Sequence, residues 1–403
     1  MPSDPSPRLR FTRMELAGSL GDLGTLLPIA IGMILINGLD PIGVLVAIGA
    51  YYILSGLYFR LTVPVQPMKV IGAYALATTL APAQITAAGL IAGAGLLVVG
   101  VTNVITPIGR LIPKPVIRGV QLSTGALLMA QGVKLMLGTA PFQVIQQAAE
   151  PFLRLQHIGP VPIGIVLGLA GGAAALVLLE NRTLPAGLAI VLGGMAVGAL
   201  LGNLDGLDAV RPGWHMPSLL PFGWPNSADF SFALLVLVVP QLPMTVGNAV
   251  VANADLSREY FGERSHRVTY RGLTISMGLA NLASSVIGGM PLCHGAGGLA
   301  AHYRFGARTA GSNLMIGTLF IALGVFLGRE ALAVLHLLPL AVLGVLLVFA
   351  GAQLSLTVLD LQTRKEFFVC LLILGITLAS NLAAGFLVGV AVAYALKSEK
   401  LHV

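Results

Sequence analysis

Three polar stretches interrupt an otherwise apolar chain, and their residue types suit the binding of an anion. In the first, at residues 63–73, Pro64, Gln66 and Pro67 break a long apolar run. Proline forbids a continuous helix, and broken backbone at membrane depth persists only where protein or a water-filled cavity satisfies its polar groups. We therefore expect a lined site here. A half-helix with Pro67 as its first residue would offer N–H donors and partial positive charge, and Gln66 would donate from its amide.

The second and third polar stretches lie in the other half of the chain. Residues 240–248 read PQLPMTVGN and place Gln241, Thr245 and Asn248 at helical spacing. Polar groups in a membrane are costly and tend to be functional, so these are candidate substrate contacts, with bonding between helices as the alternative. Residues 288–298 read GGMPLCHGAGG and form a second broken segment. Its backbone N–H groups could cradle a ligand, because glycine lets the backbone approach closely; tight helix packing is the alternative.

Two titratable groups lie beside these stretches. Asp22 belongs to a cluster with Ser19 in the first apolar span, expected at residues 15–36. A carboxylate beside an anion is unfavourable, so Asp22 either faces away or is protonated when substrate is bound; a bond to the broken backbone is the alternative. His294 either donates a hydrogen bond to substrate or takes up a proton; the alternative is a neutral, buried histidine that is bonded to a carbonyl. Lys69 either offsets the substrate's charge, pairs with Asp22, or extends toward the membrane surface.

The composition indicates a polytopic all-α membrane protein. Apolar residues make up 56% of the chain and charged residues 10%, which excludes a soluble globular domain. Apolar runs of about 20 residues recur from Leu16 to Leu396 and predict about 14 spans, one of them at residues 331–349. Lys and Arg concentrate in the connections of one side, so we place both termini in the cytoplasm, with the cell (inner) membrane as the location. This asymmetry also explains the net charge of +7 without a nucleic-acid partner.

The polar stretches occupy matched places in the two halves. The third segment of each half is broken around a proline, and the opening segment of each half carries a polar cluster. Seven spans per half, an odd number, predict a 7+7 inverted repeat with the site at the repeat interface. The expected units are a cytoplasmic tail at 1–14, a first repeat at 15–202, an extracytoplasmic loop at 203–229, a second repeat at 230–396 and a cytoplasmic tail at 397–403.

VPVQPMK at residues 63–69, together with PQLPMTVGN at 240–248, resembles the molybdate transporters related to the sulfate permeases. The resemblance covers essentially the whole chain. It implies core and gate domains, a substrate held between the two broken segments, and a homodimer. It also implies molybdate as the substrate, with sulfate and tungstate as close competitors. The predicted substrate contacts are Ser19, Gln66, Pro67, Met68, Gln241, Thr245, Asn248, Cys293, His294, Gly295, Ala296 and Gly297.

The function predicted from these observations is secondary active transport of a tetrahedral oxyanion by alternating access. We expect proton coupling through Asp22 and His294, no cofactor and no bound metal. A nucleobase permease of the same fold is an alternative, but neither Gln241 nor the Cys293–His294 region supplies the carboxylate that a base would need. A membrane enzyme is the other alternative. Cys293 and His294 are adjacent in sequence, and no hydrolase or phosphate-loop motif accompanies them.

Overall fold

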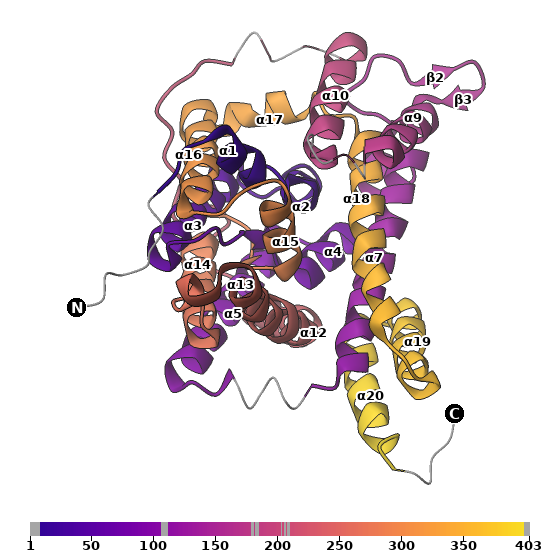
Figure 1. Ribbon diagram of the computed structural model, residues 1–403. Coiled ribbons are helices and arrows are strands. Elements are labelled where there is room, and N and C mark those ends of the chain that lie inside the picture. The colour runs from indigo at the N-terminus through magenta and orange to yellow at the C-terminus, as the bar shows by residue number, and fades with distance from the viewer. Residues whose placement is uncertain are drawn as a thin grey trace.

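The computed structural model describes residues 9–105, 112–178, 181, 185–202, 204, 207 and 210–398. Most of the predicted N-terminal tail, the end of the C-terminal tail and part of the predicted loop at 203–229 therefore lie outside the described residues. The described part is mostly helical, and its helices form two groups (Figure 1). In one group, helices and two short strands gather around the two broken segments. In the other, helices α7 and α18 lie side by side.

The first group, here called the broken-segment group, is drawn from both halves of the chain. Its elements are α1 (Arg13–Ser19), α2 (Leu23–Leu35), α3 (Pro41–Phe59), β1 (Gln66–Pro67), α4 (Lys69–Thr78), α5 (Pro82–Thr102), α11 (Ser227–Phe232), α12 (Val239–Met244), α13 (Asn253–Phe261), α14 (Tyr270–Val286), β4 (Leu292–Cys293), α15 (Ala296–Arg304) and α16 (Ala310–Leu327). The π-helical turns η2 (Ala233–Val238) and η3 (Thr245–Ala252) flank α12, and a short 3-10 turn η4 (Gly262–Ser265) follows α13.

The second group, here called the α7–α18 group, also draws on both halves. Its elements are α7 (Lys114–Leu137), α8 (Pro141–Gln146), β2 (His157–Ile158), β3 (Val161–Pro162), α9 (Ile163–Leu178), α10 (Ala186–Leu201), α18 (Leu340–Ser355), η6 (Leu356–Asp360), α19 (Arg364–Ala379) and α20 (Leu382–Ala395). The short elements η5 (Gly328–Glu330) and α17 (Ala331–Leu335) connect α16 to α18. Each group thus combines segments that are far apart in sequence.

Several helices can cross a membrane. Within the described ranges, six helical stretches are long and apolar enough to do so, and the bent pair α1 and α2 would make a seventh. Three shorter apolar helices, α9, α10 and α20, accompany them. The chain is therefore built to cross a membrane several times, although the predicted number of about 14 spans exceeds what length and composition alone identify.

Two predicted spans are divided in the structure. The span expected at 15–36 is two helices, α1 and α2, which meet at an angle of 49° beside Asp22. The span expected at 331–349 is wrong, because α17 ends at Leu335 and α18 begins at Leu340 after Pro339. Proline removes an N–H donor and restricts the residue before it, so a new helix starts there.

The opening segment of the second half stays continuous despite its prolines. A helical stretch runs from Ser227 to Ser265 through Pro240 and Pro243. The π-helical turns η2 and η3 lie on either side of the prolines. Proline has no N–H group and cannot donate the i→i−4 hydrogen bond of an α-helix. π-helical turns also depart from this hydrogen-bond pattern, so they occur where the α-helical pattern is already interrupted.

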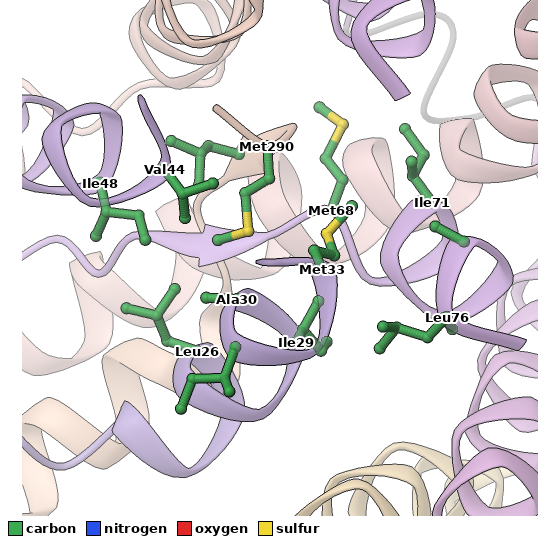
Figure 2. Packing of buried hydrophobic residues seen from close by; sticks show 14 of the residues in the cluster. Leu26, Ile29, Ala30, Met33, Val44, Ile48, Met68, Ile71, Leu76 and Met290 are labelled. Carbon is green, nitrogen blue, oxygen red and sulfur yellow. The ribbon is translucent and has the colours of Figure 1, made fainter. Parts of the chain in front are cut away.

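The broken segments are embedded in the main apolar core. Met68 and Met290, one from each segment, are both buried and lie among side chains of α2 and α3 (Figure 2). Small residues let α7 and α18 approach closely in the other group. A Cβ atom added at Gly132 would lie 2.4 Å from the carbonyl oxygen of Gly344, so a larger residue there would force the two helices apart.

A buried carboxylate fixes the start of α18. Glu150, in the connection between α8 and β2, accepts hydrogen bonds from the backbone N–H groups of Leu340 at 2.8 Å and Ala341 at 2.6 Å. An anion at a helix N-terminus satisfies unpaired donors and matches the helix dipole. Burial raises the pKa of the Glu150 carboxyl to about 7, against the opposing effect of the two N–H donors. This contact ties α18 to the α8–β2 connection.

Candidate functional site

The two broken segments meet at the centre of the broken-segment group. Strands β1 and β4 pair antiparallel, with Gln66 opposite Cys293 and Pro67 opposite Leu292. The N–H of Met68 donates to the carbonyl of Pro291 at 2.9 Å. This pairing brings the two broken segments together. The expected helix start at Pro67 is wrong, because Pro67 belongs to β1 and α4 begins at Lys69.

Two asparagines take the place of further strands beside this pair. Asn281 on α14 accepts from the N–H of Leu292 at 2.9 Å and donates to the carbonyl of the same residue at 2.7 Å. Asn313 on α16 does the same with Val63, accepting at 3.2 Å and donating at 2.7 Å. Both side chains are fully buried. Each amide satisfies the donor and the acceptor of one residue, as a neighbouring strand would.

Other side chains satisfy two further carbonyl groups of the broken backbone. Tyr52 donates its hydroxyl to the carbonyl of Val65 at 3.2 Å, and Nδ1 of His294 lies 2.8 Å from the carbonyl oxygen of Pro64. A carbonyl only accepts, so Nδ1 carries a hydrogen. Nε2 of His294 is 2.8 Å from the Tyr51 hydroxyl. Histidine and tyrosine thus serve here as fixed partners of the backbone.

A cavity of about 450 Å³ opens between the two helix groups. Its polar lining from the broken-segment group comprises Asp22, Thr25, Gln66, Lys69, Asn248 and Arg304, with the backbone of Gly297. The facing wall from the α7–α18 group contributes Gln121, Asn181, Gln353 and Thr357 among apolar side chains. This is a concave, mostly apolar space with a few convergent polar groups, which is the usual form of a small-ligand site.

Gln66 and Asp22 form the centre of the cavity wall. Nε2 of Gln66 donates to both carboxylate oxygens of Asp22, at 2.8 Å each. Oε1 of Gln66 is buried and has no hydrogen-bond partner within the described part of the chain. Of the alternatives for Asp22, the structure therefore shows a bond to the Gln66 side chain rather than to broken backbone.

Helix α15 begins against this pair, and glycine makes the approach possible. A Cβ atom at Gly295 would lie 1.8 Å from Oε1 of Gln66, and one at Gly298 would lie 2.4 Å from a carboxylate oxygen of Asp22. A Cβ at Gly297 would meet nothing within 4 Å, because this residue faces the cavity. The N-cap residue Gly295 has no side chain with which to cap the helix. The first N–H groups of α15, which have no partner within the helix, therefore lie at the cavity wall.

The structure brings only some of the predicted residues to the cavity. Gln66, Asn248, Gly297 and Asp22 line it; Ser19, Pro67, Met68, Gln241, Thr245, Cys293, His294, Gly295 and Ala296 are outside its lining. Oε1 of Gln241 accepts from the N–H of Val70 at 3.0 Å, and Nε2 donates to Thr245 at 3.1 Å. Cys293 donates its thiol to the carbonyl of Pro67 at 3.3 Å. The assignment of these residues as substrate contacts stays a prediction.

Two kinds of residue at the site are not among those predicted from the sequence. Thr25, Gln121, Asn181, Arg304, Gln353 and Thr357 line the cavity, while Asn281 and Asn313 hold the broken backbone. Polar side chains within apolar runs carry a signal at Gln121, Asn281, Asn313 and Gln353. Sequence alone, however, does not tell which of these polar side chains face a cavity and which satisfy backbone.

Solved membrane-transporter structures share this fold. The transmembrane domain of a cyanobacterial bicarbonate transporter, BicA, matches with a TM-score of 0.66 and 19% identity, covering 96% of this chain and 98% of that one. The murine Solute Carrier 26 family member A9 anion transporter, in its inward-facing state, matches with a TM-score of 0.66 and 14% identity over 97% of this chain and 69% of that one. At these identities the likeness shows the fold alone.

Sequence comparison identifies the family. The model described as "Molybdate transporter of MFS superfamily" matches residues 14–128 and 233–354. Molybdate transporter 2 of Arabidopsis thaliana is 32% identical over 96% of this chain and 88% of its own length. Molybdate transporter 1 of Chlamydomonas reinhardtii is 30% identical over 94% of this chain and 90% of its own length. The chain belongs to this molybdate transporter family, and it is a multi-pass integral membrane transporter rather than an enzyme.

We expect Asn281→Leu to destabilise the protein strongly, because it leaves the buried N–H and C=O of Leu292 without their partner. Each unsatisfied group costs about 1–3 kcal/mol. The control is Asn381→Ala, which removes the N-cap of α20 and should cost only about 0.5–2 kcal/mol. Thermal unfolding of the purified protein in detergent measures both. Equal unfolding temperatures for the two variants would contradict the proposed role of Asn281.

Proposed function

We propose that this chain is a secondary active transporter that carries molybdate across the membrane by alternating access. The observation that carries the proposal is the start of α15. Its backbone N–H groups lie at the cavity wall at Gly297, beside Gln66 and Asn248. A helix N-terminus suits an anion because unpaired donors and the positive end of the helix dipole coincide there. The known relatives are named molybdate transporters, which supplies the identity of the anion.

The two half-helices contribute unequally to this site. At α4, Gln241 already occupies the N–H of Val70. At α15 the N-cap is glycine, with no side-chain cap. We propose that α15 supplies the backbone donors and that Asn248 supplies an amide donor. Nε2 of Gln66, which holds Asp22 in this structure, supplies a second amide donor when it turns from Asp22 to the anion. Lys69 also lines the cavity, where its charge offsets part of the charge of a dianion.

The wider architecture follows the same proposal. The broken-segment group acts as the core domain and carries the substrate; the α7–α18 group acts as the gate domain. Together they form a 7+7 inverted repeat of about 14 spans. We place both termini in the cytoplasm and the protein in the cell (inner) membrane, as the distribution of Lys and Arg indicates. A homodimer is part of the proposal, because the family resemblance implies it.

The proposed driving force is proton coupling through Asp22. A dianion that enters a negatively charged cell moves against about 2.3 kcal/mol per charge per 100 mV, so accumulation needs a coupled cation or exchange. Asp22 lines the cavity, and both of its carboxylate oxygens accept hydrogen bonds from Nε2 of Gln66. Protonation of Asp22 would remove the negative charge that faces the substrate. His294 stays a second candidate, although its ring nitrogens bond Pro64 and Tyr51 in this structure.

Uptake by purified protein in sealed vesicles tests the function directly. We expect labelled molybdate to accumulate, with competition by unlabelled tungstate and sulfate, which share its charge and tetrahedral shape. Bicarbonate and uracil should not compete, because neither is a tetrahedral dianion. Vesicles without protein are the control. Molybdate uptake no higher than in those vesicles, or competition by uracil alone, would remove the proposed function.

Gln66→Ala and Gln241→Ala should both weaken molybdate binding, for different reasons. Gln66→Ala removes a donor from the cavity, and a hydrogen bond to a charged ligand contributes about 1.5–3 kcal/mol. Gln241→Ala releases the N–H of Val70 and disturbs α4, so it should also lower the unfolding temperature. Calorimetry measures the affinity, and thermal unfolding separates the two causes. Wild-type affinity in both variants would place the anion elsewhere.

Asp22→Asn should separate binding from coupling. Asparagine resembles the protonated carboxyl, so molybdate binding should persist while its pH dependence and accumulation against a gradient are lost. Asp229→Asn, on the exposed first turn of α11, is the control and should leave all three unchanged. Vesicle uptake with and without an imposed pH gradient measures the effect. If Asp22→Asn and His294→Gln both retain gradient-driven accumulation, neither group carries the proton.

A further inference from the structure

A second cavity lies apart from the anion cavity. It is a groove of about 580 Å³ between α3 and α14. Its volume is within the range of about 300–1,000 Å³ that is usual for small-molecule sites. Its walls are almost entirely apolar, and none of its lining residues lines the anion cavity. The walls consist of Ala47, Ala50, Tyr51, Leu54, Ser55 and Tyr58 of α3 and Gly272, Ile275, Ser276, Leu279, Ala280, Ala283, Ser284 and Ile287 of α14 and its C-cap.

The rim of the groove is exposed and apolar. Leu54 is 64% exposed and Leu279 is 55% exposed, one on each wall. Helix α3 is long and apolar enough to span the membrane. A groove along such a helix opens into the hydrocarbon region of the bilayer, where an acyl chain is the natural occupant.

One end of the groove carries positive charge. Tyr58, near the end of α3, and Gly272, near the start of α14, line this end. Arg271 precedes Gly272 and is exposed, and Arg60 follows α3 directly. Arg267 donates to the carbonyl of Tyr58 at 3.3 Å and so bridges the two helices here. Clusters of arginine beside a membrane-spanning helix attract the phosphate of anionic lipids.

The floor of the groove connects it to the broken backbone. Tyr51 and Ser276 both line the groove, and their hydroxyls lie 2.8 Å and 3.2 Å from Nε2 of His294. His294 in turn holds the carbonyl of Pro64, two residues before Gln66. A molecule in the groove therefore packs directly against the side chains that position β1.

We propose that this groove binds one anionic phospholipid, with an acyl chain between α3 and α14 and its phosphate at the Arg60, Arg267 and Arg271 end. Both parts of the lipid find a complementary surface: apolar walls for the chain and a cluster of guanidinium groups for the phosphate. The site is separate from the anion cavity and does not depend on which anion is transported. It places a lipid in contact with the supports of the paired strands.

The test is native mass spectrometry of protein reconstituted in equal amounts of phosphatidylglycerol and phosphatidylcholine. We expect one phosphatidylglycerol to be retained per chain in preference to phosphatidylcholine. Arg267→Gln with Arg271→Gln should lower this retention by about fivefold per arginine removed. The matched control is Arg364→Gln, an exposed arginine at the start of α19 and away from the groove. Equal retention of the two lipids by the wild type would overturn the proposal.

A second variant tests the groove itself. Ala280→Phe fills it from the α14 wall, while Val98→Phe adds the same bulk to an exposed position of α5 outside the groove. We expect loss of the retained lipid only for Ala280→Phe, with unfolding temperature and oligomeric state measured on the same samples to show that both variants fold. Unchanged lipid retention in folded Ala280→Phe overturns the proposal. So does a change of oligomeric state without loss of lipid, which would mean that a second copy of the chain covers the groove.

Discussion

The structure depends on one constraint: backbone N–H and C=O groups that leave regular helices inside a membrane must find partners within the protein. The two broken segments satisfy part of this need by pairing with each other as β1 and β4. Buried side chains supply further partners, chiefly the asparagines at 281 and 313. The N-terminus of α15 is different. It has glycine at its N-cap and lies at a cavity wall, so its donors are available to a ligand. The proposed site is thus the start of α15, where no side chain caps the helix.

The sequence predicts the broken segments well because proline and glycine act locally. Pro64 and Pro67 exclude a continuous helix whatever surrounds them, and the second break follows from the glycine-rich run around Pro291. The exact start of α4 was wrong by two residues because strand pairing with β4 is a long-range interaction that no local pattern encodes. The bend beside Asp22 was missed for a similar reason. Its glycines permit a break, but the contacts of α1 with α15 and α16 involve segments that are distant in sequence.

At the candidate site too, local features can be predicted from the sequence, whereas long-range contacts cannot. Polar residues in apolar runs are readily found, but a glutamine at the cavity wall and one that caps a half-helix look alike in sequence. Gln66 lies directly before Pro67 in a broken segment, and Gln241 lies directly after Pro240 in a helical segment with two prolines. Of these two glutamines, only Gln66 lines the cavity. The facing wall could not be derived, since it requires α7 and α18 to be placed opposite α15. Family membership supplies the anion's identity, which neither hydropathy nor geometry provides, because molybdate and sulfate share charge and shape.

The most direct test of the account is the position of the bound anion. Tungsten scatters X-rays anomalously, so crystals grown with tungstate, as a substitute for molybdate, reveal where the anion lies. The account predicts one strong peak in the cavity, about 3 Å from the backbone nitrogen of Gly297 and within reach of the Gln66 and Asn248 amides. A peak that contacts only Arg304, or one outside the cavity, would contradict the claim that the uncapped start of α15 holds the substrate.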